Sequence, residues 1–357
     1  MGSGDREVRD VVPRDAAVSD VTMRDVAARE VTVRDVIVLG GGAAGLSGAL
    51  LLARAGLDVA VLDAGSPRNA PAAHMHGFLT RDGMPPAELV ERGRAEVAAY
   101  GGALVDTEVA EVLPGFVVRL ADGTSQSAPR LLVTTGMRDE LPEVAGVAQR
   151  WGRDVLQCPY CHGHEVRDQP LGVLATGPVS THQALMVRQW SDDVVLFEHT
   201  HALSHDEREQ LAAVGVRVMP GTVTELVVRD DVLRGVETEG GSTPRSAVFV
   251  APRFVPNTAV LAGLDCRATE QGFLIVDESG ATSAPGVWAA GNVVNPRAQV
   301  ITAAGAGAAA AMALHQDVVL ARTNAAVSAK RLHANGFTAE LEREVAEIVL
   351  GDRRYGL

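Results

Sequence analysis

A glycine-rich turn, Gly40 to Gly45, places the strongest constraint on the fold of this chain. It follows an apolar segment expected to be a strand, Val36 to Leu39, and opens an expected helix, Ala43 to Ala55. A second expected strand, Val59 to Leu62, leads to the acidic residue Asp63. A strand, a G-x-G-x-x-G turn, a helix and a second strand ending in an acid make up the dinucleotide-binding unit of a parallel, doubly wound sheet. The sequence therefore predicts an α/β fold with a Rossmann-like domain.

Each residue of the turn has a physical task in binding a dinucleotide. Gly40 permits the tight turn, Gly42 lets the backbone approach a pyrophosphate, and Gly45 lets helix and strand pack closely. The free amides and dipole of the helix N-terminus favour the phosphates, and Asp63 can accept hydrogen bonds from ribose hydroxyls. The expected contacts also include Ala43, Ala44 and Ala64. The turn alone does not distinguish FAD from NAD, because both present a ribose and a pyrophosphate to it.

A second unit of the same kind begins at Leu171 to Ala175, continues as a helix to Trp190 and returns as a strand at Val194 to Phe197. The chain of 357 residues is long enough for two domains. We therefore predict two Rossmann-like, doubly wound, three-layer domains, with the second inserted in the first. The expected first domain comprises 35–145 and 268–322, and the expected inserted domain comprises 146–267.

The two ends of the chain lie outside these domains. Residues 1–34 carry a five-residue repeat of alternating charges with isolated valines, as in Arg24-Asp25-Val26. This pattern favours a disordered extension, and the alternative is a short helix or strand laid on the body. Residues 323–357 are expected to form a helical tail that covers the body or a partner subunit. Its amphipathic stretch, Thr338 to Leu350, has one apolar face formed by Leu341, Val345, Ile348 and Val349.

Composition excludes several classes of protein. Hydrophobic residues make up 46% and charged residues 22%, as in globular domains. The net charge of -13 and the lack of a basic stripe argue against nucleic-acid binding. The most apolar window, Val300 to Leu314, is mainly Ala and Gly and is too weakly hydrophobic to span a membrane. No secretory signal pattern is seen, so we expect a cytoplasmic protein without nucleic-acid or membrane partners.

The sharpest chemical feature is Cys158-Pro159-Tyr160-Cys161-His162. Two cysteines separated by two residues can form a small reversible disulfide, and His162 adds a group that can move protons. A zinc site is the main alternative, with His164 as a fourth ligand, but structural zinc sites normally take a second ligand pair from a separate segment. Inert thiols are the remaining alternative. We expect a redox pair and no bound metal, and we expect the isolated Cys266 to be a packing residue.

Three further segments of the chain resemble thioredoxin reductases. The segment Gly286 to Val293, followed by Ala298-Gln299-Val300, resembles their second FAD segment. Leu132 to Gly136 resembles the domain crossover, and Val255 to Thr258 resembles the end of the inserted domain. The resemblance covers about 36–321 and implies FAD, an FAD-binding first domain, an NADPH-like inserted domain and a homodimer. It implies that Cys161 faces the flavin and that Cys158 exchanges with substrate. The further implied FAD contacts are Gly136, Gly291, Asn292, Gln299 and Val300.

This chain departs from that family at two positions of the FAD and thiol sites. Asn292 stands where the family usually has Asp, and an amide can still bond to a ribityl hydroxyl. His162 also stands where the family usually has Asp, so the acid/base group has been exchanged. The nearby His74, His76 and Gly77 lie in a stretch that can line the flavin, and each histidine has either a site role or a hydrogen-bonded structural role.

The second nucleotide turn is degraded. It has Ala175 in place of the first glycine, and Pro178 lacks a backbone donor where a phosphate would be held. After the next strand, the position of the cation that binds the extra phosphate of NADPH carries Glu198. The sequence therefore predicts no productive use of NADPH and leaves a smaller role for NADH open.

The C-x-x-C-His-Gly pattern beside a degraded turn is similar to the gliotoxin and holomycin dithiol oxidases. That resemblance implies FAD-dependent closure of a disulfide in a small-molecule, specialised-metabolite dithiol, with O2 as acceptor and H2O2 as product. An NAD(P)H-dependent thioredoxin-disulfide reductase is the nearest alternative. A flavin-binding or zinc-binding regulatory module without turnover is the third.

Overall fold

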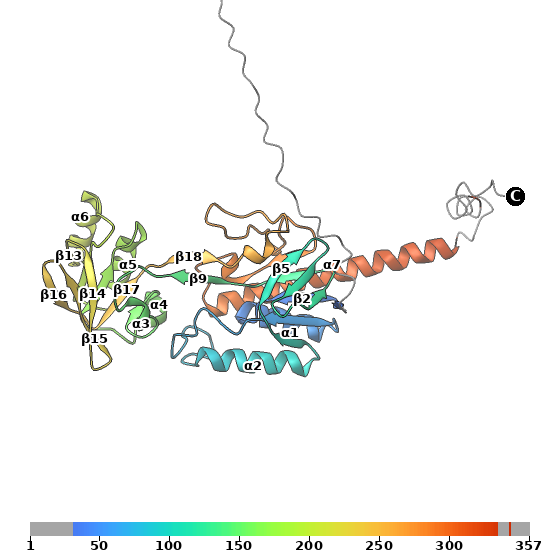
Figure 1. Cartoon of the computed structure of the whole chain (residues 1–357), viewed down its shortest axis with the longest axis horizontal. Coiled ribbons are helices and arrows are strands. Elements are labelled where there is room, and N and C mark those ends of the chain that lie inside the picture. The colour runs from blue at the N-terminus through green and yellow to red at the C-terminus, as the bar shows by residue number, and fades with distance from the viewer. Residues whose placement is uncertain (1–30, 335–342, 344–357) are drawn as a thin grey trace, which may run out of the picture.

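Two five-stranded parallel sheets form the framework of the molecule (Figure 1). The computed structural model describes residues 31–334 and residue 343. The first sheet has the strand order β19 (Val287–Ala289), β8 (Leu131–Val133), β2 (Val36–Leu39), β3 (Val59–Asp63) and β4 (Ala103–Asp106). The second has the order β10 (Val155–Leu156), β17 (Ala247–Val250), β11 (Leu171–Leu174), β12 (Val194–Phe197) and β13 (Arg217–Met219). The predicted fold of two Rossmann-like domains is confirmed.

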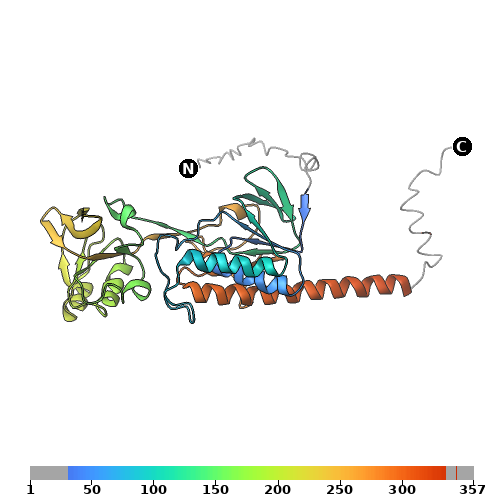
Figure 2. The same ribbon diagram turned by 90° about the horizontal axis from the view of Figure 1, so that it is seen from below.

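The first sheet is sandwiched between helices and a smaller sheet. Helices α1 (Ala43–Arg54), α2 (Pro86–Ala99) and α7 (Val300–Ala334) lie on one face, as Figure 2 shows. On the other face lies a sheet of order β1 (Val31–Val33), β7 (Ser125–Ser127), β6 (Val117–Leu120) and β5 (Val109–Leu113). Val36 and Val38 pack toward the helices, whereas Ile37 and Leu39 pack toward the small sheet. Because successive strand residues face opposite ways, a strand buried on both faces is apolar throughout.

The inserted domain repeats this three-layer plan. Its helices are α3 (Val147–Arg150), α4 (Pro159–His162), α5 (Val179–Val187) and α6 (His205–Ala213). Its second layer is a sheet of order β14 (Val223–Arg229), β15 (Val232–Thr238) and β16 (Gly241–Pro244). Val173 packs toward α5 and α6, whereas Leu174 packs toward the three-stranded sheet.

A two-stranded antiparallel ribbon joins the domains (Figure 1). It consists of β9 (Met137–Glu140), which leaves the first domain, and β18 (Arg253–Pro256), which returns to it. The predicted boundary at residue 267 is wrong, because Leu261 in η1 (Ala259–Leu261) is already buried in the core of the first domain. Cys266 packs against the same core. The residues between η1 and Cys266 form no regular strand, so hydrophobic periodicity does not reveal where the first domain resumes.

The structure also corrects the predicted ends of the folded region. Strand β1 pairs with β7, so the prediction of disorder up to residue 34 is wrong for Val31–Val33, while 1–30 lie outside the described residues. Helix α7 runs unbroken past the predicted boundary at residue 322. The predicted amphipathic stretch, Thr338 to Leu350, lies outside the described residues apart from Arg343.

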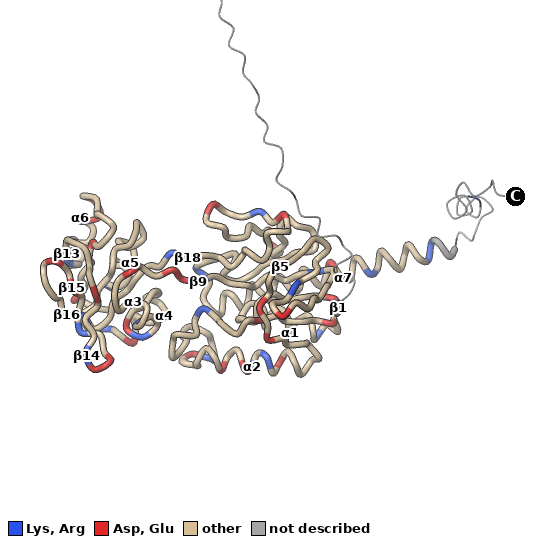
Figure 3. The backbone as a smooth tube through the Cα atoms, viewed as in Figure 1, with Lys and Arg blue, Asp and Glu red and all other residues tan. Residues whose placement is uncertain are grey.

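The described helices and charges give two further findings. None of the helices among the described residues is both long and apolar enough to cross a membrane. In the view of Figure 3, Lys and Arg are interspersed with Asp and Glu along both domains. That view therefore presents no continuous basic stripe.

Close backbone contact fixes the helices of the first domain. A Cβ atom on Gly307 of α7 would lie 2.0 Å from the Ala44 carbonyl oxygen of α1, and a Cβ on Gly45 would lie 1.9 Å from the Gly40 oxygen. Such distances are possible only without side chains. The N-terminus of α1 is therefore held between the first nucleotide turn and α7.

We predict that Gly307→Ala lowers the free energy of unfolding by roughly 1–3 kcal/mol, because the added methyl forces α1 and α7 apart. The matched control is Gly305→Ala on the same helix, where a Cβ would meet nothing within 4 Å. This control is expected to raise stability by up to about 1 kcal/mol, since Ala favours a helix over Gly. Urea unfolding followed by circular dichroism measures both, and equal stability of the two variants would contradict the packing account.

Candidate active site

A cavity of about 330 Å³ is lined by residues of both domains. The predicted cofactor residues that line it are Gly40, Gly42, Ala43, Ala44, Asp63, Gly136, Gly291, Asn292, Gln299 and Val300. The inserted domain contributes Cys158, Cys161 and His162 to the same lining. Gly45 and Ala64 do not line the cavity. The structure thus brings a nucleotide turn and a thiol pair, which are far apart in the sequence, to one space.

The first nucleotide turn has the geometry that a dinucleotide requires. Gly40 has a φ of 101°, and a Cβ there would lie 2.5 Å from the Thr134 carbonyl oxygen. Asp63 Oδ1 accepts a hydrogen bond from the Gly41 amide at 2.9 Å. A Cβ on Gly42 would meet nothing within 4 Å, and no side chain caps the N-terminus of α1. The amides of that first turn therefore remain available, and these residues fit the pyrophosphate and ribose of FAD.

Asn292 has a structural reason for replacing Asp. Its side-chain Nδ2 donates to the carbonyl oxygens of Asn295 and Ala298, both at 3.0 Å. A carboxylate would face two carbonyl oxygens without a proton to share. The amide therefore holds the turn before α7 and keeps its own oxygen as an acceptor.

The two thiols differ in acidity. Cys158 immediately precedes α4, and both cysteines are free thiols. The Cys161 thiol donates to Cys158, and this lowers the pKa of Cys158 to about 7, with further help from the Cys161 and Tyr160 amides and the charge of Arg68, against the effect of burial. The same hydrogen bond and burial raise the pKa of Cys161. Cys158 is therefore the thiolate of the reduced pair.

His162 is placed to accept a proton. Burial lowers its pKa, and Glu165 opposes this shift only in part. Its Nδ1 atom is buried and has no hydrogen-bond partner within the described part of the chain. A neutral imidazole beside the thiols can take up a proton near pH 7.

The two histidines of the first domain occupy different positions. His74 and His76 both line the cavity. His76 lies between Asp82, 3.4 Å from its Nδ1, and Glu165 of the inserted domain, 3.5 Å from its Nε2. Asp82 also accepts from the Gly77 amide at 2.8 Å, and this bond is the main cause of its lowered pKa. His76 therefore connects the two domains at the edge of the site.

The proposed zinc ligands do not converge. Among residues 31–334 and 343, no group of three or more His, Cys, Asp or Glu side chains could hold a metal ion. His164 instead has its Nε2 2.9 Å from Arg167. Cys266 lies far along the chain in the first-domain core, where burial raises its pKa and its sulfur lies 3.7 Å from the Thr282 hydroxyl.

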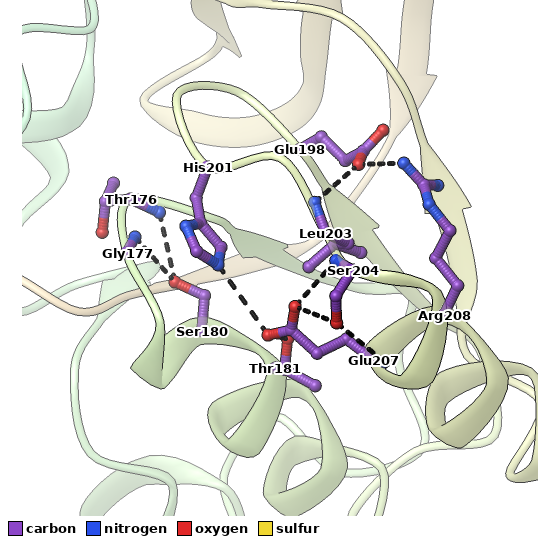
Figure 4. A network of polar contacts seen from close by, with 10 residues as sticks. All are labelled: Thr176, Gly177, Ser180, Thr181, Glu198, His201, Leu203, Ser204, Glu207 and Arg208. Carbon is purple, nitrogen blue, oxygen red and sulfur yellow. Dashed lines mark hydrogen bonds and ion pairs between the residues drawn. The ribbon is translucent and has the colours of Figure 1, made fainter.

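The second nucleotide turn already uses the groups that a phosphate would need (Figure 4). The Ser180 hydroxyl accepts from the amides of Thr176 and Gly177 at 3.1 and 3.4 Å. At the end of β12, Glu198 accepts from Arg208 and from the Leu203 amide, and the Arg208 bond is the main cause of its lowered pKa. The two amides of the turn and the carboxylate of Glu198 therefore all have partners within the protein.

A second acidic group closes the network in Figure 4. Glu207 accepts from the Thr181 hydroxyl at 2.8 Å and forms a capping box with Ser204 at the start of α6. The bonds from Ser204 and Thr181 lower the pKa of Glu207 to about 2. Its negative charge therefore persists beside α5 at any physiological pH.

Sequence reasoning missed several residues that shape these sites. Thr134 donates to the Gly40 oxygen at 2.8 Å, Ser180 fills the second turn, Glu165 reaches His76, and Arg68 lines the cavity. Ser180 alone had a local signal, because a hydroxyl at the start of a helix is a common partner for free amides. The other contacts join segments that are remote in the sequence.

Comparison with known proteins places these features in a family. The model of the pyridine nucleotide-disulphide oxidoreductases matches residues 34–316. Thioredoxin reductase sirT of Leptosphaeria maculans is 30% identical over 297 residues, 77% of this chain and 91% of that protein. A thioredoxin reductase of Streptomyces coelicolor is 30% identical over 298 residues, 78% of this chain and 91% of that protein.

A solved structure also matches over most of its length. The crystal structure of HlmI has 53% identity and a TM-score of 0.81, and the match covers 83% of this chain and 96% of that one. The chain belongs to the pyridine nucleotide-disulphide oxidoreductase family, as a thioredoxin reductase-like, flavin-dependent thiol/disulfide oxidoreductase.

Proposed function

We propose that this protein is an FAD-dependent dithiol oxidase that closes an intramolecular disulfide in a small-molecule dithiol of specialised metabolism. Molecular oxygen is the electron acceptor and H2O2 is the product. One observation carries the proposal: the thiol pair shares a cavity with an open nucleotide turn, while the amides of the second turn are bonded to Ser180. On the family resemblance, we also propose a cytoplasmic homodimer.

The thiol exchange proceeds in two steps from the enzyme disulfide. A substrate thiolate attacks Cys158 Sγ, the bond to Cys161 breaks, and Cys161 leaves as a thiolate. The second substrate thiolate then attacks the substrate sulfur of this mixed disulfide, so the substrate disulfide forms and Cys158 leaves. The amides of Tyr160 and Cys161 and the charge of Arg68, which lower the pKa of Cys158, also stabilise Cys158 as the leaving thiolate. Neutral His162 takes a proton from the second substrate thiol.

The expected cofactor residues have separate tasks. Gly42 and the first amides of α1 hold the pyrophosphate, Asp63 the ribose, and Asn292 and Gln299 the flavin end. The chemistry that FAD supplies when bound is removal of the electron pair from the reduced cysteines and its transfer, with the two substrate protons, to O2 as H2O2.

The alternative is an NAD(P)H-dependent thioredoxin-disulfide reductase. The names of two relatives favour it, since both are called thioredoxin reductases. The occupied turn and the Glu198–Arg208 pair argue against it, because a nucleotide phosphate must replace protein hydrogen bonds there. We therefore favour the oxidase.

We predict that a small dithiol bleaches the flavin absorbance of the holoenzyme under anaerobic conditions, whereas NADPH and NADH do not. Admission of O2 is expected to restore the yellow colour and release one H2O2 per dithiol consumed. Cys158→Ser removes the exchange thiol and is expected to abolish bleaching by dithiol, and Cys266→Ser serves as the matched control. Catalytic bleaching by NADPH would overturn the oxidase proposal.

We predict that the rate of Cys158 alkylation by iodoacetamide in the reduced protein rises with pH around a midpoint of about 7. Thiolate is the reactive form, so the rate is low below this midpoint and reaches a plateau above it. Mass spectrometry of the modified peptide identifies the site. A midpoint at the ordinary cysteine value, or preferential modification of Cys161, would contradict the acidity assigned to the pair.

A further inference from the structure

Arg68 lies in the cavity with both cysteines but belongs to the first domain. It follows β3 by a short loop, and its side chain is 23% exposed. Two of its guanidinium nitrogens, Nε and Nη2, donate to the carboxylate of Asp139 at 2.9 and 2.8 Å. A bidentate pair of this kind fixes orientation as well as distance. The Asp139 side chain is only 9% exposed, so water competes little for these bonds.

The same guanidinium contacts both strands of the connecting ribbon. Its central carbon lies 5.1 Å from the centre of the Phe254 ring, which is a cation–π contact. Asp139 is on β9 and Phe254 is on β18, and the two residues are direct partners across the ribbon. One side chain of the first domain therefore contacts both strands of the ribbon at a single pair of facing residues.

The loop that carries Arg68 contacts the inserted domain at two further places. A Cβ on Gly152 would lie 2.8 Å from the carbonyl carbon and oxygen of Pro71, so the two backbones nearly touch. His76 approaches Glu165 of the inserted domain at 3.5 Å. These contacts all favour the domain arrangement in which the thiols line the cavity.

Arg68 is also the cation that acts on the thiols. Its charge lowers the pKa of Cys158 and of Cys161. The opposing charge is Glu165, which raises the pKa of Cys161. The other titratable or charged side chains that line the cavity with the pair are His162 of α4, His74 and His76 of the first-domain loop, Asp63, Asp139 of the ribbon and Arg297.

We propose that Arg68 is a positioning residue for the dithiol reaction, which clamps the ribbon so that the cysteines stay at the first nucleotide site and places a fixed positive charge beside them. This inference rests on the proposed function. If the flavin receives its electrons from the thiol pair and not from a pyridine nucleotide, one domain arrangement, with the thiols at the first nucleotide site, is sufficient for the reaction. The clamp and the charge can be separated by substitution. Lysine keeps the charge but cannot form the two-pronged bond to Asp139, whereas methionine removes both.

The test measures two properties of Arg68→Met and Arg68→Lys. The first is the pH profile of Cys158 alkylation in the reduced holoenzyme, and the second is the rate of anaerobic flavin bleaching by dithiothreitol. Arg81→Met is the matched control, since Arg81 lies on the same loop, its guanidinium donates to the Thr80 carbonyl and it does not line the cavity. A purely structural role for Arg68 would leave the alkylation midpoint unchanged.

We expect Arg68→Met to raise the alkylation midpoint by roughly half a pH unit, about a twofold loss of rate at pH 7, and to slow bleaching. Arg68→Lys is expected to keep the midpoint near that of the wild type and still slow bleaching. Asp139→Asn, which weakens the clamp without removing the arginine, is expected to slow bleaching without raising the midpoint.

The inference is overturned if Arg68→Met matches Arg81→Met in both measurements, or if Arg68→Lys bleaches as fast as the wild type. These results differ from failure of the proposed function. If the proposed function fails, the flavin of the wild-type protein is reduced by NADPH and not by a dithiol, and this result does not depend on the alkylation profiles of the variants.

Discussion

Backbone-to-backbone contact between the turn, α1 and α7 is the constraint on which the rest of the site depends. The Ala44 carbonyl occupies the place that a side chain on Gly307 would take. Both helices begin at the cavity, α1 with Ala43 and α7 with Val300. Their mutual distance therefore sets the separation between the amides expected to hold phosphate and the residues expected at the flavin end.

The reactivity of the thiol pair arises from asymmetry between two otherwise similar groups. Cys158 receives hydrogen bonds from the Cys161 thiol and from backbone amides, whereas Cys161 provides a proton and is further disfavoured as an anion by burial. The hydrogen bond from the Cys161 thiol is the main cause of this asymmetry, and the amides at the start of α4 add to it. The first domain adds Arg68, so the chemistry of the inserted domain depends on the contact between domains.

The sequence predicted those parts that are encoded locally. Continuous apolar segments predicted β2 and β12 with their observed limits, and the glycine turn, the cysteine pair and the altered residues of the second turn stood out by residue type and spacing. The resemblance of Val255 to Thr258 indicated the end of the inserted domain, but the boundary at residue 267 was set too late. The pairing of Val31–Val33 was not predicted, because it depends on a distant partner. Arg68, Glu165 and Thr134 were missed for the same reason.

On the proposed function, the Ser180 hydroxyl accounts for the loss of a nucleotide site whose strand, turn and helix are kept. The strand, turn and helix of the second unit remain, and nothing bulky fills the turn beside Gly177. An incoming anion would first have to displace an internal ligand and then approach two carboxylates, those of Glu198 and Glu207. Replacing Pro178 with glycine alone would therefore leave the amides of Thr176 and Gly177 bonded to Ser180. Nucleotide binding would also require changes at Ser180 and at the two carboxylates, which lie in three separate segments of the chain.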